Sequence, residues 1–316
     1  METIGVRRRV ARLLVLAALC ATRPVAAGQT IGWDADDFLV AEFFGGVIAV
    51  FDSDFSFKGL LDDDFSDVAG LDLAPDGSLV AVSQQETVRR YTADGSMIGE
   101  FTHPEVGQGA IDISVSARPR LYIGLRESSE GMSEFELDGT FLRKYINPIT
   151  PYRGVAAVPG NGVWAGDVNE GVPIDVWSIP AETRTEIPLD NGQFAAGQSF
   201  AYSQLTQTVL MTDVSLGLTQ VVERTLGGTF VRLFAEALNI DLLGVTRGPT
   251  NAVFATECPN GLIFSWEADG TPLGFFDPPD LGACPVGIVW AGEPGFSVFA
   301  DGFESGDTSA WSATVP

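Results

Sequence analysis

The sequence predicts an all-β fold, a six-bladed β-propeller. The first observation is a motif that occurs six times: an apolar strand, an aromatic residue, a tight turn and a further strand. The second is the spacing of the turns, which follow one another after 40, 44, 42, 47 and 42 residues. Strand-rich units with a period in the low forties are typical of propeller blades. The turn positions are Asp54, Asp94, Asp138, Pro180, Gly227 and Asp269.

The third observation concerns the length and the ends of the chain. Helical periodicity is weak after residue 28, and six units of this period account for most of the remaining residues. We expect residues 287–293 to complete the blade that begins near residue 35, because a ring closed in this way leaves no strand edge unpaired. A seventh, incomplete blade is the alternative.

The first two strands of each unit have distinct patterns. The first strand follows a glycine, which lets the chain turn sharply into a crowded centre. These glycines are Gly70, Gly109, Gly154, Gly197, Gly244 and Gly287. The second strand is almost wholly apolar, as expected for a strand that is buried on both faces. Its copies lie at residues 38–41, 79–82, 121–123, 163–165, 209–211 and 253–255.

The outer two strands of each unit complete the pattern. The third strand carries an aromatic residue in five units, and Arg224 stands in the unit that lacks it. The aromatic residues are Phe51, Tyr91, Phe135, Trp177 and Trp266. The fourth strand is more polar and alternates, as expected for the outer edge of a blade.

The two ends of the chain lie outside the repeat. Arginines precede an apolar stretch at 13–21 that is too short to span a bilayer, and Val25-Ala26-Ala27 has the small residues of a cleavage site. We therefore expect a signal peptide over 1–27 and a propeller over 28–300. Lipidation of Cys20 is an alternative to simple cleavage. Residues 301–316 resemble a short C-terminal segment of secreted proteins of Gram-negative bacteria, and we expect a disordered tail.

The charge of the chain limits its partners. Residues 1–27 hold five of the 18 basic and one of the 42 acidic residues, which leaves 13 basic and 41 acidic residues and a net charge of −28. Nucleic acid is excluded as a partner because no basic stripe offsets phosphate repulsion. The acidity serves either solubility or cation binding in loops. We expect a secreted or periplasmic monomer without a membrane span.

Two cysteines remain after the predicted signal peptide, and we expect a disulfide between them. Cys258 lies in a loop from a second to a third strand, and Cys284 lies in a loop that enters a first strand. Both kinds of loop emerge on the same face of a propeller, and an exported chain favours the oxidised state. A metal–thiolate site is the alternative, but it needs further ligands.

One repeated position suggests a cation site. The residue just past the second strand is Glu42, Ser83, Leu125, Asp167, Asp213 and Glu257 in the six units. Four of the six are carboxylates, and Asn169 and Asn260 follow two of them closely. Oxygen ligands that converge at a channel mouth suit calcium, so we predict a metal site at Glu42, Asp167, Asn169, Asp213 and Glu257. Hydrogen bonds from the backbone of each carboxylate's own loop are the alternative.

Other side chains could contact a ligand or the channel. His103 is the only histidine, and it lies in a loop on the face of the cysteines, as a general base or as a surface residue. Asp72 and Asp112 are expected at matching places in first strands, where they point into the channel or bond to neighbouring backbone. The aromatic residues and the arginine that we expect among the ligand contacts are Phe43, Phe44, Tyr152, Arg153 and Trp290.

Two strings carry a resemblance to known propellers, Val40-Ala41-Glu42 and Trp164-Ala165-Gly166-Asp167-Val168-Asn169, each of which leads into a strand and an aromatic residue. Over residues 31–295 the chain resembles the NHL-repeat propellers and is similar to the wider six-bladed group that includes SMP-30-type proteins. We expect a secreted module that binds a protein or a small ligand. The alternative implied by the resemblance is a divalent-metal-dependent hydrolase or lactonase, in which the ion polarises a carbonyl or activates water.

Overall fold

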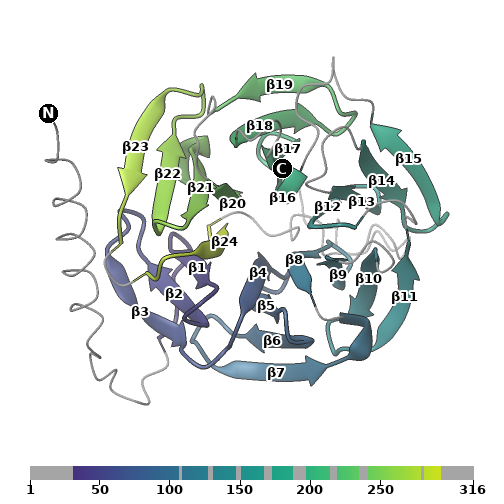
Figure 1. Ribbon diagram of the computed structural model, residues 1–316, viewed down its shortest axis with the longest axis horizontal. Helices are drawn as coiled ribbons and strands as arrows, with labels where there is room; N and C mark the ends of the chain where they lie inside the picture. The colour runs from purple at the N-terminus through teal and green to yellow at the C-terminus, as the bar shows by residue number, and fades with distance from the viewer. Residues whose placement is uncertain are drawn as a thin grey trace, which may run out of the picture.

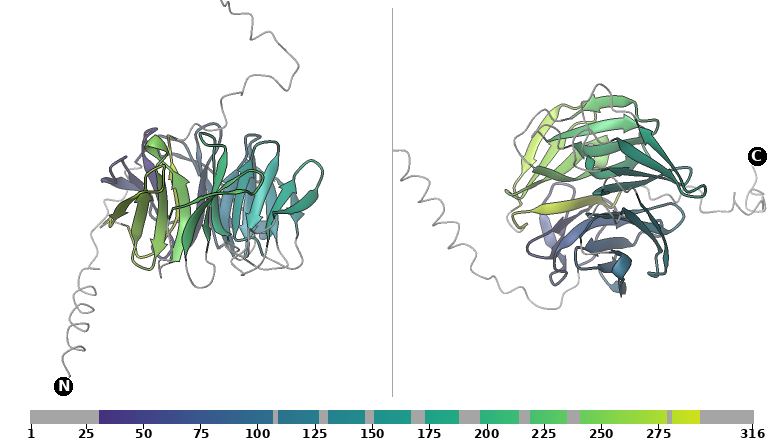
Figure 2. Two further views of the ribbon diagram at one scale, coloured as in Figure 1. Left: turned by 90° about the horizontal axis from the view of Figure 1, so that it is seen from above. Right: turned by 45° about the vertical axis from the view of Figure 1, so that its right-hand side comes forward.

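Six antiparallel sheets of four strands each surround a central axis and form a six-bladed β-propeller (Figure 1). The predicted fold class is therefore confirmed. Seen from the side, the blades stand next to one another in a short, broad disc (Figure 2). The computed structural model describes residues 31–106, 109–126, 131–146, 151–166, 173–187, 197–213, 219–234, 241–278 and 281–292.

The four strands of each blade run in order from the axis outward. Blade 1 consists of β24 (Pro285–Trp290), β1 (Phe38–Glu42), β2 (Val47–Phe51) and β3 (Phe57–Asp62). Blade 2 consists of β4 (Val68–Leu73), β5 (Leu79–Ser83), β6 (Thr87–Tyr91) and β7 (Met97–Thr102). Blade 3 consists of β8 (Ala110–Val115), β9 (Arg120–Leu125), β10 (Met132–Glu136) and β11 (Phe141–Tyr145).

The remaining three blades have the same order. Blade 4 consists of β12 (Gly154–Val158), β13 (Gly162–Gly166), β14 (Ile174–Ser178) and β15 (Thr183–Ile187). Blade 5 consists of β16 (Gly197–Ser203), β17 (Thr208–Asp213), β18 (Gln220–Thr225) and β19 (Phe230–Leu233). Blade 6 consists of β20 (Asp241–Arg247), β21 (Val253–Cys258), β22 (Leu262–Trp266) and β23 (Pro272–Phe276). In the described connections lie two short 3-10 helices, η1 (Pro104–Val106) and η3 (Pro249–Asn251).

The ring closes through blade 1, as the sequence predicts. Strand β24, from the C-terminal part of the chain, pairs antiparallel with β1, and Phe38 lies opposite Trp290. Val40 lies opposite Ile288 in the same ladder. The innermost strand of blade 1 is thus supplied from the other end of the propeller sequence, which joins the first and last blades without a seventh blade.

The six predicted turns all connect third to fourth strands. In four of them an aspartate accepts a hydrogen bond from the backbone N–H two residues later, which is the geometry of an Asx turn. The N–H of Ser56, Ser96, Thr140 and Thr271 lies 2.9 Å from the carboxylate in each case. Local side-chain chemistry therefore fixes the turns that set the repeat.

The hydrophobic core consists of six clusters, one between each pair of neighbouring blades. The apolar second strands contribute to all of them, since both faces of each sheet are covered by the next blade. The third-strand aromatic residues lie in the same clusters, for example Tyr91 between blades 1 and 2 and Phe135 between blades 2 and 3. Arg224 is fully buried at the corresponding place in blade 5, where its Nη1 donates to the carbonyl oxygen of Gly228 at 2.7 Å.

The six innermost strands meet most closely at one level, which we call the collar. The strand registers place Gly70, Asp112, Gly154, Ser199, Gly244 and Gly287 at this level. A Cβ atom at Gly70 would lie 3.0 Å from the Cα of Asp112 in the next blade, and one at Gly244 would lie 3.0 Å from the Cα of Gly287. Glycine is required at these contacts because the backbones of adjacent blades nearly touch.

Candidate functional site

The candidate site is a hollow at one end of the central channel. It opens on the face that carries the loops from second to third strands and the Cys258–Cys284 disulfide, which we call the disulfide face. The hollow has a volume of about 300 Å³. Its described lining residues come from all six blades, so no single repeat could form it.

Two rings of residues line this hollow, which we call the mouth hollow. The inner ring consists of the residues that directly precede the collar. Its members are Ala69, Ile111, Arg153, Gln198, Leu243 and Val286. The outer ring includes the residues directly after the second strands of the first three blades, which are Phe43, Gln84 and Arg126, together with Phe44 and Cys284. The mouth therefore combines apolar, carboxamide and guanidinium groups.

The collar separates the mouth hollow from a narrower lower channel of about 90 Å³. Asp112 and Ser199 line both spaces. The carboxylate of Asp112 accepts hydrogen bonds from the N–H of Ile113 and of Val155, both at 3.0 Å. Burial nevertheless raises the pKa of Asp112 well above its usual range. Asp112 thus forms part of the floor of the mouth.

Asp72 lines the lower channel, one step further from the mouth. Its carboxylate accepts bonds from Leu73 N at 2.7 Å, Val115 N at 2.6 Å and Ser114 Oγ at 3.0 Å. Burial raises its pKa to about 6. Asp72 and Asp112 therefore do both things that the sequence suggested: they line the channel, and they accept hydrogen bonds from neighbouring backbone. Their predicted equivalence is wrong. In the strand registers, the counterpart of Asp72 in blade 3 is Ser114, and the counterpart of Asp112 in blade 2 is Gly70.

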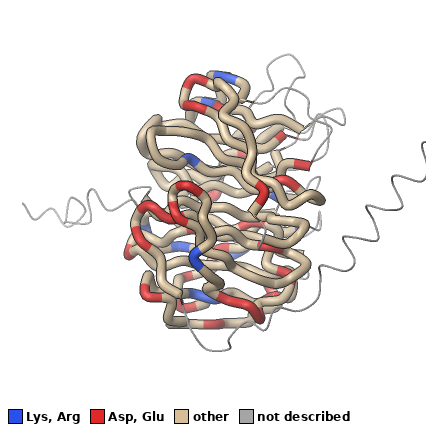
Figure 3. The backbone as a smooth tube through the Cα atoms, turned by 90° about the vertical axis from the view of Figure 1, so that its left-hand side faces the viewer, with Lys and Arg blue, Asp and Glu red and all other residues tan. Residues whose placement is uncertain are grey.

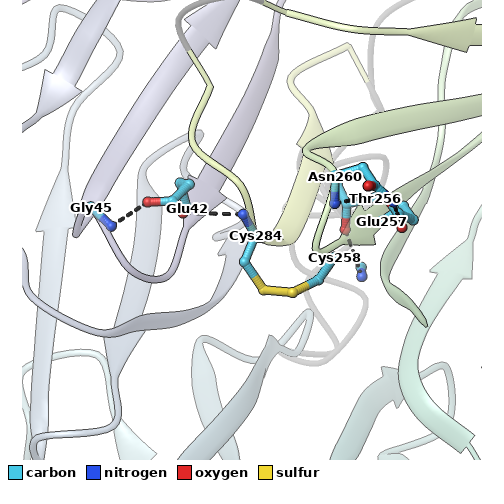
Figure 4. Close-up of a disulfide and its surroundings, with 8 residues drawn as sticks. Glu42, Gly45, Thr256, Glu257, Cys258, Asn260 and Cys284 are labelled. Carbon is cyan, nitrogen blue, oxygen red and sulfur yellow. Dashed lines mark hydrogen bonds between the residues drawn. A yellow bond between two sulfur atoms is a disulfide. The ribbon is translucent and has the colours of Figure 1, made fainter. Parts of the chain in front are cut away.

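The predicted disulfide between Cys258 and Cys284 is confirmed (Figure 4). It joins Cys258, the last residue of β21 in blade 6, to the loop that leads into β24 in blade 1. The bridge therefore spans the junction at which the ring closes. Cys284 also borders the mouth hollow, so the disulfide holds one part of its wall.

The repeated position that holds Glu42 and Glu257 comes one residue before the outer ring of the mouth hollow in the sequence; Glu42, for example, directly precedes Phe43. Glu42 is buried, and its carboxylate accepts hydrogen bonds from Gly45 N and from Cys284 N, the latter at 3.2 Å (Figure 4). Glu257 is also buried and accepts bonds from the backbone N–H and the side-chain amide of Asn260 at 3.1 and 2.7 Å. Both carboxylates are thus engaged by nearby loops, as the alternative interpretation proposes.

The predicted calcium site stays a prediction. Asp213 is buried at the end of β17, while Asp167 and Asn169 lie outside the described residues. Within the ranges that the structure describes, no group of three or more His, Cys, Asp or Glu side chains lies close enough to hold a metal ion.

The predicted ligand contacts do not all lie at one place. Phe43, Phe44 and Arg153 line the mouth hollow, and Phe44 is 72% exposed. Trp290 lines the lower channel instead, because β24 runs from the disulfide face to the opposite face. His103 lies on the rim between blades 2 and 3, where its ring stacks on that of Phe141 at a centroid distance of 5.3 Å.

Tyr152 is a correction to the predicted ligand contacts. Its side chain is only 1% exposed and lies in the core between blades 3 and 4. Its hydroxyl donates to the Asp175 carboxylate and accepts a bond from Trp177 Nε1 at 2.9 Å. The aromatic residue next to Arg153 therefore supports the blade junction and does not face a ligand.

The sequence reasoning missed Gln84, Arg126, Gln198 and Leu243 as lining residues. Side chains alternate along a strand, so the residue after each predicted carboxylate position and the residue before each collar position point toward the mouth. The sequence repeat carries this information. Gln84 and Arg126 directly follow Ser83 and Leu125, which occupy the repeated position in blades 2 and 3.

Two further predictions fall outside the described residues: the signal peptide over 1–27 and the tail over 301–316. In the described part of the chain, no helix has both the length and the hydrophobicity to cross a membrane.

The fold is similar to that of several solved structures. A chain in the crystal structure of a nidogen/laminin complex matches with a TM-score of 0.65 and 14% identity, over 80% of this chain and 97% of that one. Virginiamycin B lyase from Staphylococcus aureus matches with a TM-score of 0.60 and 13% identity, over 84% and 94%. A streptogramin B lyase matches with a TM-score of 0.58 and 14% identity, over 80% and 87%. No protein-family model and no curated protein matches the sequence.

Proposed function

We propose that this chain is a secreted binding propeller that holds a small ligand in the mouth hollow. The observation that carries the proposal is the lining itself: all six blades contribute to one concave space of about 300 Å³. Small-molecule sites are typically concave, largely apolar and supplied with a few convergent polar groups. The disulfide beside the hollow suits an oxidising location outside the cytoplasm.

The similar solved structures support the general proposal without choosing a ligand. One belongs to a nidogen/laminin complex, and two are lyases named for virginiamycin B and streptogramin B. Because their sequences are so different from this one, these similarities support the fold alone. The same fold can serve both binding and catalysis. We also propose, from the sequence pattern, that this chain belongs to the group of NHL-repeat and SMP-30-type propellers.

The hydrolase or lactonase alternative requires a divalent ion at the mouth. Glu42 and Glu257 already accept hydrogen bonds from their surroundings, so a metal would have to replace those bonds. Binding without metal chemistry is the function that the described geometry supports best.

A screen of small ligands tests the proposal. A library of charged and neutral compounds is added to the wild type and to the double variant Phe44→Ala/Arg153→Ala, and thermal unfolding is followed. A ligand of the mouth raises the melting temperature of the wild type, because it binds the folded state, and not that of the double variant, which lacks two side chains of the lining. Gln204→Ala, at the lower channel, serves as the control. Compounds that stabilise both proteins equally, or none that stabilise the wild type, contradict the proposal.

A further inference from the structure

We propose that the mouth hollow selects amphiphilic carboxylates, small molecules with a carboxylate at one end and an apolar group at the other. This inference rests on the proposed function and names its ligand class. It follows from how the lining residues are distributed around the ring, which the repeat alone does not reveal.

The cationic side of the hollow is formed by blades 3 and 4. Arg126 follows β9, and Arg153 precedes β12. The two segments abut, since a Cβ atom at Gly124 would lie 3.3 Å from the carbonyl oxygen of Arg153. Two guanidinium groups on adjacent blades can bind both oxygens of one carboxylate, and charge-assisted bonds of this kind are about twice as strong as neutral ones.

Arg126 is available for such a bond. Its backbone is fixed by a hydrogen bond from its N–H to the carbonyl oxygen of Gly109 at 3.0 Å. Its side chain is exposed and forms no hydrogen bond or ion pair with another residue of the described ranges. A guanidinium on a fixed backbone at the edge of a cavity is placed to bind an anion that enters it.

The apolar side lies across the channel. Blades follow one another around the ring in numerical order, so blade 1 faces blade 4 and blade 6 faces blade 3 (Figure 1). Blade 1 contributes Phe43, Phe44 and Val286, and blade 6 contributes Leu243. The rings of Phe43 and Phe44 form an edge-to-face pair with centroids 5.2 Å apart. A ligand held at the arginines therefore extends toward aromatic and aliphatic surface.

Uncharged polar groups lie between the two sides. Gln84 comes from blade 2 and Gln198 from blade 5, which face each other across the hollow. These carboxamides can bond to a polar group in the middle of a ligand without favouring either charge. The polarity of the lining thus decreases across the cavity, from guanidinium groups through carboxamides to phenyl rings.

The charge of the lining differs from that of the molecule. The chain has a formal net charge of −24, and acidic residues are spread over the outer strands and turns in Figure 3. Among the described lining residues of the mouth, by contrast, two are arginines and one, Asp112, is acidic. Asp112 lies at the floor, and its two carboxylate oxygens accept hydrogen bonds from the backbone N–H groups of Ile113 and Val155.

Three matched probes test the selection: 4-phenylbutyrate, its neutral amide and 4-phenylbutylamine. Their dissociation constants are measured by isothermal titration calorimetry with the full disulfide-bonded protein. We expect the carboxylate to bind at least tenfold more tightly than the amide, and the amine to bind more weakly still. Arg126→Gln and Arg153→Gln each weaken carboxylate binding about tenfold and leave amide binding unchanged.

Controls separate charge from fold. Arg118→Gln, an exposed arginine in the turn after β8 on the opposite face, leaves all three dissociation constants unchanged. Phe44→Ala weakens the carboxylate and the amide by the same factor, because both carry the phenyl group. Circular dichroism and melting temperature check that each variant is folded.

Each other result has a definite meaning. If the amide binds as tightly as the carboxylate and Phe44→Ala weakens both, the ligand class is wrong and the mouth remains a binding site. If the carboxylate binds equally to wild type and both arginine variants, it binds elsewhere, and the inference is overturned. If none of the probes binds at millimolar concentration, the inference fails, and the screen described above decides the proposed function separately.

Discussion

Asp72 shows how a residue in the channel can be both buried and structural. Its carboxylate bridges blades 2 and 3, because it lies on β4 and accepts a hydrogen bond from Val115 N on β8. Burial opposes its ionisation and raises its pKa to about 6, whereas the ordinary value for aspartate is near 4. The hydrogen bonds that it accepts limit this rise but do not cancel it.

The raised pKa predicts a pH dependence of stability. Between about pH 4 and pH 6 the folded protein largely keeps the proton on Asp72 while the unfolded chain loses it, so this group lowers the free energy of unfolding by about 2 kcal/mol over that range. Asp72→Asn removes this term. We expect the stability difference between wild type and variant to change by that amount between pH 4 and pH 6, measured by urea unfolding.

The control for Asp72 is Asp94, an exposed turn residue. Its pKa is lowered, chiefly by the hydrogen bond from the Thr92 hydroxyl and then by that from Ser96 N. Its contribution to stability is therefore present above its ordinary pKa and is lost as the pH falls, the opposite direction to Asp72. Parallel pH profiles for wild type and Asp72→Asn would show that the channel carboxyl titrates normally.

At the scale of elements, the close packing of innermost strands at the collar predicts a strong effect of one methyl group. Gly244→Ala places a Cβ atom 2.9 Å from Val286 O and 3.0 Å from the Cα of Gly287, both backbone atoms of the neighbouring blade. We expect a loss of about 1–3 kcal/mol in the free energy of unfolding, because the strands must move apart. Gly99→Ala, on the outer strand β7 with open space around it, is the matched control. Equal effects of the two substitutions would argue against a tight collar.

The strand that closes the ring is held by pairing and by the disulfide. Cys258 and Cys284 are separated by 26 positions in the sequence. A crosslink over a loop of this length stabilises the folded state by about 3–4 kcal/mol, mainly by restricting the unfolded chain. We expect Cys258→Ala/Cys284→Ala to lose about this much in urea unfolding under oxidising conditions. Under reducing conditions the wild type should approach the variant, and a persistent difference would assign the effect to packing.

The sequence predicted the elements well because the repeat depends on local chemistry. Asp94 and Asp138 form their turns with residues two positions away, and the apolar second strands are continuous in the sequence. The candidate site was predicted less well because it depends on register. The register makes Asp112, and not Gly109, the counterpart of Gly70, so Asp72 and Asp112 lie at different levels of the channel. Alternation along β9 exposes Arg126 and buries the preceding Leu125.

At the scale of the whole molecule, the acidic charge and the metal prediction can be separated by one titration. Glu42 and Glu257 at the repeated position accept hydrogen bonds from nearby loops, so we expect calcium at millimolar concentration to leave the melting temperature unchanged. Magnesium at the same concentration controls for ionic strength. A rise of several degrees with calcium alone would establish the cation site and favour the metal-dependent alternative.

The ring as a whole determines where a ligand can bind. Six blades leave a channel that the collar divides, and of the two spaces that the described residues line, the one on the disulfide face is the larger. Each blade contributes one or a few side chains to the described lining of the mouth hollow. The function of the propeller therefore depends on which residues occupy a few equivalent positions around the ring.

A crystal structure of the protein soaked with 4-phenylbutyrate tests the location of the site most directly. The account predicts the carboxylate between Arg126 and Arg153, with the phenyl ring directed toward Phe43 and Phe44. Density confined to the lower channel beside Trp290, or to the outer strands of the blades, would contradict it.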